Sequence, residues 1–174
     1  EALRVAAGRK LEEETGIGDV FLEQLYTFGD PDRDPSQRVI TVAYYAALPV
    51  AGAEDQTAED GENVCWWPVQ SLPPLAFDHA RIVEYAVTRL RYKLEYTAVG
   101  FELLPDEFTL TELQNTYEIV LGGVLDKRNF RRKILGANVI EGTGGQRTGD
   151  GRPAKLYRYR EDAVAEVQAR RLFP

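Results

Sequence analysis

Phe108-Thr-Leu-Thr-Glu-Leu-Gln114 is the stretch that decides the fold of the C-terminal part of the chain. Thr109 is followed three residues later by Glu112, which is the capping box that begins an α-helix. Phe108 and Leu113 stand where a hydrophobic staple closes over the first turn. Apolar residues then recur at helical spacing until a Gly-Gly pair at 122–123 ends the helix.

A second helix and a hairpin follow the first helix. Asp126 is placed to cap a helix that runs to about Leu135, so a short turn joins two helices, as in a helix-turn-helix. The segments Val139–Glu141 and Lys155–Arg160 bracket a Gly-rich stretch, which predicts a β-hairpin. A hairpin directly after the second helix is a wing. The residues from about Phe108 onward are therefore predicted to form a winged helix-turn-helix that binds double-stranded DNA.

The basic residues of this module have different expected roles. Residues in the first turn of the second helix face base edges in the major groove, and arginine suits guanine whereas asparagine suits adenine. The candidates for base reading are Lys127, Arg128 and Asn129. The candidates for phosphate contacts are Arg131, Arg132, Arg147 and Arg152.

The charge is distributed unevenly along the 174 residues. Between residues 122 and 160 there are ten basic and three acidic residues, a net charge of +7. The whole chain carries −7, so the remainder carries −14. A basic module joined to an acidic one is typical of a protein that binds a polyanion through one part only.

The acidic N-terminal half alternates between helical and strand-like patterns, and the chain as a whole is predicted to be α+β. The sequence contains no run of about 18 apolar residues, so it predicts no membrane-spanning segment. A single cysteine, Cys65, favours a reducing, cytoplasmic setting and is expected to be a small core residue. Helices are expected at 1–17, 78–96 (capped by Asp78) and 161–172, strands at 21–27, 38–47, 64–69 and 99–104, and a mobile loop at 51–62.

Arg9-Lys-Leu-Glu-Glu-Glu-Thr-Gly-Ile17 resembles the end of the Nudix box, and Glu1 stands eight residues before Arg9, where that motif has an earlier glutamate. The resemblance implies a Nudix-like α/β/α domain. The opening glycine of the motif would lie six residues before Glu1. The domain is therefore expected to be N-terminally truncated in this chain, without the strands that usually precede the box.

One position of the box differs from the motif. Residues 10, 13 and 14 share one helical face, and in a Nudix hydrolase three carboxylates there gather Mg²⁺ against a diphosphate. Here Glu13 and Glu14 remain but position 10 is Lys10. A lysine places a positive charge where the cation would bind and can pair with both glutamates. We therefore expect no catalytic residues and no metal site, with Mg²⁺ relevant only if residual hydrolysis persists.

A Nudix-like domain followed by a winged helix is similar to the Nudix-related transcriptional regulators of the NrtR family. The strings that carry this resemblance include Leu25–Pro35, Arg38–Tyr45, Leu75–His79, Leu125–Lys133 and Gly151–Tyr157. The resemblance implies a Nudix-like effector domain at residues 1–95 and a DNA-binding domain at 96–174. It implies a bacterial repressor of NAD metabolism genes that binds palindromic operator DNA as a homodimer and is released by ADP-ribose or a related nucleotide.

Matching positions give a set of candidate effector-binding residues. Arg9, Glu13 and Glu14 match the box, and Phe28, Asp30, Arg33 and Arg38 match the loop and strand that follow it in the family. Each of these residues also has an ordinary structural interpretation. Two alternatives remain open: an ADP-ribose pyrophosphatase with an appended DNA-binding domain, and a sugar-responsive regulator on the same scaffold.

Overall fold

The computed structural model describes residues 1–49, 64–96, 99–148 and 153–163. The chain divides into two compact units, Glu1–Arg89 and Leu90–Pro174. The predicted loop at 51–62, Arg152 and all but the first residues of the predicted helix at 161–172 lie outside the described residues. The predicted boundary between residues 95 and 96 stays a prediction. None of the helices in the described parts of the chain has the length and apolar character that crossing a membrane would require.

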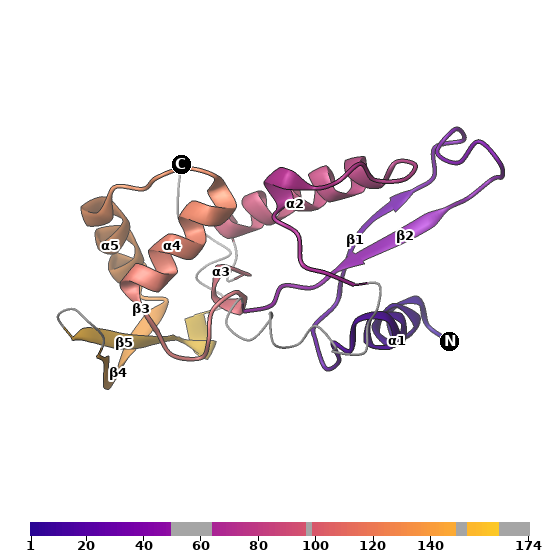
Figure 1. Ribbon diagram of the computed structural model, residues 1–174. Coiled ribbons are helices and arrows are strands. Elements are labelled where there is room, and N and C mark those ends of the chain that lie inside the picture. The colour runs from indigo at the N-terminus through magenta and orange to yellow at the C-terminus, as the bar shows by residue number, and fades with distance from the viewer. Residues whose placement is uncertain (50–63, 97–98, 149–152, 164–174) are drawn as a thin grey trace. The chain divides into compact units, whose positions relative to one another are not determined.

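The first unit contains helix α1 (Leu3–Thr15), strands β1 (Glu23–Phe28) and β2 (Thr41–Tyr45), and the start of helix α2 (His79–Tyr96). Figure 1 shows β1 and β2 as a long hairpin, and the two strands pair antiparallel with an irregularity between Gln24 and Tyr26. Helix α1 ends as predicted at Gly16, which adopts the left-handed conformation (φ 72°) and donates its N–H to Glu12 O at 2.9 Å.

An aromatic cluster joins the hairpin to α2. Phe28 is buried, and its ring lies edge-on to Tyr26 at 5.2 Å and to Tyr85 at 5.9 Å between centroids. Leu22 and Leu25 are buried as well. The alternation of buried and exposed residues in β1 follows from the two-residue period of a strand.

Two predictions for the segment after residue 63 are wrong. Residues 64–68 form no strand, and Val69–Ser71 is a single turn of 3₁₀ helix. Cys65 is exposed rather than in the core, and the neighbouring Trp66 and Trp67 are about half exposed. Apolar composition suggested a buried strand, but the segment pairs with no other strand among the described residues, so its aromatic side chains remain at the surface.

The second unit has the element order of a winged helix. Helix α3 (Val99–Glu102), strand β3 (Phe108–Thr109), helices α4 (Leu110–Leu121) and α5 (Lys127–Gly136), and strands β4 (Ile140–Arg147) and β5 (Ala154–Tyr159) follow one another along the chain. A short 3₁₀ turn, Glu161–Ala163, comes next. The sheet order is β3-β5-β4, and both pairings are antiparallel. The predicted helix-turn-helix and hairpin are confirmed.

The predicted caps of the two helices are present. Thr109 Oγ1 accepts the N–H of Glu112 at 3.2 Å, and Glu112 Oε2 accepts the N–H of Thr109 at 2.7 Å, which completes the capping box. Helix α4 ends at Gly122 in the left-handed conformation. Asp126 Oδ1 accepts the N–H of Asn129 at 2.7 Å and begins α5. These local signals set the first helix, the turn and the second helix.

The core of the second unit lies between the helices and the sheet. Tyr117 and Phe130 meet edge-to-face at 5.6 Å, so α4 and α5 share one apolar seam. Residues 99–102 form a helix and not the predicted strand. Gly100 packs closely against the core here, because a Cβ at this position would lie 2.7 Å from Leu94 and 2.8 Å from Tyr117. Close packing of this turn overrides the strand propensity of Val99 and Phe101, both of which are buried.

Candidate functional site

The first turn of α5 presents the three candidates for base reading. Lys127, Arg128 and Asn129 are all exposed. Phe130 and Ile134 anchor the opposite side of the helix in the core, at 1% and 0% exposure. Because the helix is fixed by its buried face, the first-turn side chains point away from the core. Lys127 and Arg128 make no ion pair or hydrogen bond with any other described side chain.

Two further arginines of α5 are oriented by neighbouring side chains. Arg132 Nη2 donates to Asn129 Oδ1 at 2.7 Å, one turn back along the same helix. Arg131 Nη2 donates to Thr111 Oγ1 at 3.3 Å, at the start of α4. The Nε of Arg131 is buried and has no partner among the described residues. Arg131 therefore retains an unused donor beside the first turn of α4.

Arg147, at the end of β4, is held by the protein itself. Its Nη1 pairs with Glu112 Oε1, and its Nη2 donates to the backbone oxygen of Glu107 at 3.0 Å. The pKa of Glu112 is lowered: its partial burial opposes this shift, and the bonds from Thr109 and Arg147 outweigh it. The other predicted wing cation, Arg152, lies outside the described residues.

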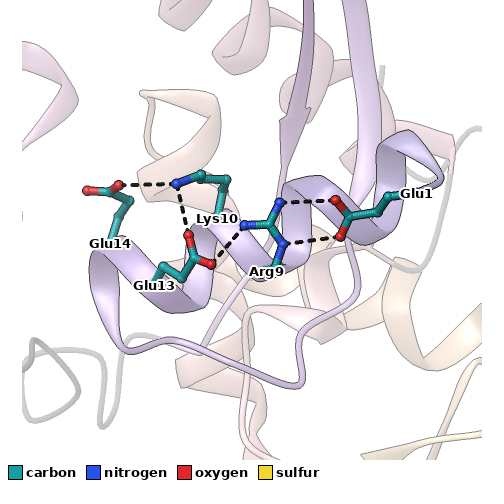
Figure 2. Close-up of polar contacts among 5 residues, drawn as sticks. All are labelled: Glu1, Arg9, Lys10, Glu13 and Glu14. Atoms are coloured by element: carbon teal, nitrogen blue, oxygen red, sulfur yellow. Dashed lines mark hydrogen bonds and ion pairs between the residues drawn. The ribbon is translucent and has the colours of Figure 1, made fainter.

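Four charged residues of α1 form one continuous network with Glu1, which precedes the helix (Figure 2). Arg9 donates to both oxygens of Glu1, at 3.1 and 3.0 Å, and to Glu13 Oε1 at 2.8 Å. Lys10 Nζ lies 2.8 Å from Glu13 Oε2 and 4.0 Å from Glu14 Oε1. Lys10 therefore reaches both glutamates, as its position on the helix predicts.

These contacts leave Glu13 without a free oxygen. Lys10 and Arg9 lower the pKa of the Glu13 carboxyl, and the bond to Glu13 raises the pKa of Lys10. Among the described residues, no cluster of three or more His, Cys, Asp or Glu side chains is arranged to hold a metal ion. A divalent cation at this helical face would have to displace the Lys10 ammonium. The residues present thus do not fit the metal of a Nudix hydrolase.

The candidate effector residues after the box lie on the β1–β2 loop and beside α2. Arg33 is 5% exposed and is paired with Asp78, which precedes α2, through two hydrogen bonds of 2.9 and 2.8 Å. Asp30 pairs with Arg81 on α2, and Arg38 Nη1 donates to Asp30 O at 3.2 Å. Phe28 belongs to the aromatic cluster. Among the described residues, no hydrogen bond or ion pair joins this group to the network on α1.

Two contributors to these groups were not among the candidates. Arg81 lies 51 residues from Asp30 in the sequence, and Asp78 lies 45 residues from Arg33. Asp78 was expected only as a helix cap, whereas its carboxylate accepts the Arg33 guanidinium. The signal that could have found both partners is the placement of opposite charges at the start of α2 and in the Asp/Arg-rich loop.

The fold, the box residues on α1 and the basic residues on α5 define a two-domain protein, with a Nudix unit followed by a DNA-binding unit of the winged helix class. The model of the NUDIX domain matches residues 1–86, and the model of the NrtR DNA-binding winged helix domain matches residues 100–159. The chain is 36% identical to NrtR of Shewanella oneidensis and covers 77% of that chain. It belongs to the NrtR family.

The backbone fold of the chain is also similar to that of solved structures. The structure of Shewanella oneidensis NrtR complexed with a 27mer DNA matches 98% of this chain with a TM-score of 0.82, and NrtR without that DNA matches the same share at 0.80. A MutT/nudix family protein from Enterococcus faecalis, at 24% identity and a TM-score of 0.63 over 92% of this chain and 70% of its own, shares the fold.

Curated relatives fall into two kinds. The ADPR responsive transcriptional repressor NtrR of Acinetobacter baylyi is 41% identical over 159 residues, which is 90% of this chain and 63% of the repressor. The ADP-ribose pyrophosphatase of Methanocaldococcus jannaschii is 33% identical over 84 residues, 48% of each protein. The chain thus spans about three fifths of the repressor and about half of the pyrophosphatase.

Proposed function

We propose that the chain is an ADP-ribose-responsive transcriptional repressor of bacterial NAD metabolism genes. The observation that carries this proposal is the exposed first turn of α5, where Lys127 and Arg128 have no ion pair or hydrogen bond with another described side chain. This turn belongs to a winged helix that is similar to one whose structure was solved with DNA. Similarity to an ADPR responsive repressor supports the same function. Such a protein would act in the cytoplasm, where its operator lies.

The proposed DNA interface divides base contacts from phosphate contacts. Lys127, Arg128 and Asn129 would enter the major groove and read base edges. Arg132 holds the Asn129 carbonyl oxygen at 2.7 Å, so it can orient the amide before DNA arrives. Arg131 would contact a phosphate oxygen through its guanidinium group. Arg152 would add a phosphate contact from the wing.

A homodimer on a palindromic operator suits this interface. One recognition helix reads only one half-site, and two copies related by a two-fold axis place their helices in successive major grooves. Two half-sites also raise the affinity of the pair over that of a single module. The dimer is proposed on this geometric ground.

The Nudix unit would serve as the sensor. The candidate contacts to a diphosphate or ribose are Arg9, Glu13, Glu14, Phe28, Asp30, Arg33 and Arg38. Of these residues, Asp30 and Arg38 are exposed to a ligand, and a ligand at Asp30 would meet its ion pair with Arg81; Phe28 and Arg33 are packed and would shape the site. An effector releases DNA if it binds the conformation that cannot bind DNA more tightly than it binds the DNA-binding conformation. A hundredfold difference between these two affinities corresponds to about 2.7 kcal/mol.

We further propose that the Nudix unit is catalytically degenerate. Lys10 stands at a metal-ligand position of the box and pairs with Glu13 and Glu14. A sensor requires only that ADP-ribose binds, so loss of the metal would leave this function intact. The second candidate, an ADP-ribose pyrophosphatase, is favoured by the 33% identity to such an enzyme over 84 residues.

Fluorescence anisotropy with the full chain tests the proposal. A duplex is first selected by the wild-type chain from a random pool, and the complex is then titrated with ADP-ribose, NAD and ribose. The proposal expects ADP-ribose to weaken binding without being consumed. Mg²⁺-dependent release of AMP at enzyme-like turnover would instead establish the second candidate, and release of DNA by a sugar alone would establish a sugar-responsive regulator.

A paired variant tests the DNA interface. Changing Arg128 and Arg131 to Ala together should weaken binding and reduce the dependence of affinity on salt. The matched control is Arg158→Gln, because Arg158 already pairs with Glu141 on the neighbouring strand at 2.6 Å. An unchanged affinity and salt dependence in the double variant would contradict the assignment of α5 as the recognition helix.

A further inference from the structure

Arg147 is the last residue of β4, on the first strand of the wing. It is paired in register with Ala154, the first residue of β5, so the tip of the hairpin begins immediately after it. Its guanidinium faces the start of α4, where Nη1 pairs with Glu112 and Nη2 donates to Glu107 O at 3.0 Å. Arg147 therefore connects the wing to residues that precede and begin the first helix of the helix-turn-helix.

Glu112 is shared between the helix cap and the wing. Its Oε2 accepts the backbone N–H of Thr109 at 2.7 Å, and its Oε1 pairs with Arg147. One carboxylate thus holds both the first turn of α4 and the end of β4. Both side chains are partly exposed, at 44% for Arg147 and 37% for Glu112, so the contact lies at the surface of the unit.

A phosphate contact would compete with these bonds. Charge-assisted hydrogen bonds to a carboxylate are stronger than neutral ones, and a phosphate oxygen would have to displace Glu112 from Arg147. Glu112 also contributes a negative charge beside any phosphate that approached. The arrangement makes Arg147 unlike Lys127 and Arg128, which have no such partner among the described residues.

We propose that Arg147 is a positioning residue: held by Glu112 and Glu107, it fixes the end of β4 against the start of α4 and makes no phosphate contact. This inference rests on the proposed DNA binding for its functional consequence. The wing would be presented to the backbone of the DNA in one orientation, and other cations of the module would neutralise the phosphates.

Hydrogen exchange of the full chain without DNA tests the structural part. Arg147→Gln and Glu112→Gln should each accelerate exchange of the amides paired at the end of the hairpin, Gln146–Arg147 and Ala154–Lys155, by about threefold, as expected for loss of an exposed ion pair. Glutamine at position 112 retains the cap. The double variant should exchange no faster than Arg147→Gln alone, because that single variant already removes every contact that Glu112 makes with the wing. Additive effects, or no effect in either single variant, would overturn the proposal.

Salt dependence of binding to sonicated duplex DNA tests the functional part. Loss of one phosphate contact lowers the slope of log affinity against log salt by about 0.9. Arg147→Gln should weaken binding with an unchanged slope, and Glu112→Gln should weaken it as well although it removes a negative charge. A slope reduced by about 0.9 in Arg147→Gln, or tighter binding by Glu112→Gln, would show that Arg147 contacts phosphate and overturn the proposal.

Two comparisons complete this test. Arg128→Gln provides the slope change expected for a proposed DNA contact. Arg158→Gln removes a cation that lies on the same hairpin as Arg147 and is paired with Glu141. If the wild-type chain fails to bind any duplex, the proposed DNA binding fails, and the hydrogen-exchange result still decides whether Arg147 and Glu112 hold the wing.

Discussion

Arg33 and Asp78 form the most enclosed ion pair in the first unit among the described residues. Nε and Nη2 of Arg33 donate to the two carboxylate oxygens of Asp78 at 2.9 and 2.8 Å, and the side chains are 5% and 14% exposed. The pair ties the β1–β2 loop, which carries the candidate effector residues, to the beginning of α2. A bidentate arginine–carboxylate contact also fixes the orientation of both groups.

Replacing Asp78 with Asn should destabilise the protein in a pH-dependent manner. The Arg33 guanidinium lowers the pKa of Asp78, so folding favours the ionised carboxylate. This contribution is fully present above the unfolded-state pKa of about 3.9 and is lost as pH falls through the lower folded pKa. Urea midpoints should differ between wild type and Asp78→Asn at pH 6, and the difference should shrink towards pH 3. Asp32→Asn, in the same exposed loop, is the control; an equal difference at both pH values would contradict the prediction.

Replacing Gly100 with Ala should destabilise the second unit. The new Cβ would lie 2.7 Å from Leu94 Cδ2 and 2.8 Å from Tyr117 Cε2, in the core. Overpacking of this kind costs about 1–3 kcal/mol, measurable by urea unfolding. Gly136→Ala is the matched control: no heavy atom lies within 4 Å of its Cβ, so it should have little effect or stabilise α5. Equal stability of the two variants would contradict the prediction.

Replacing Thr109 with Ala should remove the side-chain half of the capping box. The N–H of Glu112 would lose its acceptor at 3.2 Å, at a cost of about 1 kcal/mol in the free energy of unfolding. Thr116→Ala, within the same helix, removes only a bond from its hydroxyl to Glu112 O and should be nearly neutral. The reverse order of stabilities would argue against the cap as the start of α4.

Replacing Lys10 with Glu should create a binding site for Mg²⁺. The change removes the ammonium 2.8 Å from Glu13 and places a third carboxylate on the same helical face. Without metal, the variant should melt at a lower temperature than the wild type, because three negative charges then lie side by side on the helix. Added Mg²⁺ should raise the melting temperature of the variant. Lys10→Gln controls for loss of the ion pairs and should respond little. Equal stabilisation of the wild type by Mg²⁺ would contradict the role given to Lys10.

Local signals could be read from the sequence, and contacts between distant residues could not. The Thr109–Glu112 box, the Asp126 cap and the terminator Gly16 depend on neighbours within four residues, so their patterns predicted the helices. Residues 99–102 were misassigned because the packing of Gly100 against Tyr117 depends on the fold and not on propensity. The strand predicted at 64–69 was wrong for the same reason, because a strand depends on a distant pairing partner that the local sequence does not reveal.

The candidate sites divide along the same line. The exposure of Lys127 and Arg128 followed from the spacing of Phe130 and Ile134, which are buried on the other face of α5. The engagement of Arg147 by Glu112, 35 residues away, has no counterpart in the local pattern. Burial of Arg33 likewise depends on its contact with Asp78, 45 residues away, so the sequence alone could not show that this arginine is packed while Arg38 is exposed.

The irregularity in β4 gives the wing a place to change length. Between Gly142 and Gln146 the register advances four residues on β4 while the partner strand advances only two, from Tyr157 to Lys155. The surplus is an even number, so side chains beyond it keep the same faces as those before it. Relatives could gain or lose a pair of residues here and alter the reach of the wing without rebuilding the sheet. The glycines at 144 and 145 make this stretch the natural point at which to vary the reach of the wing.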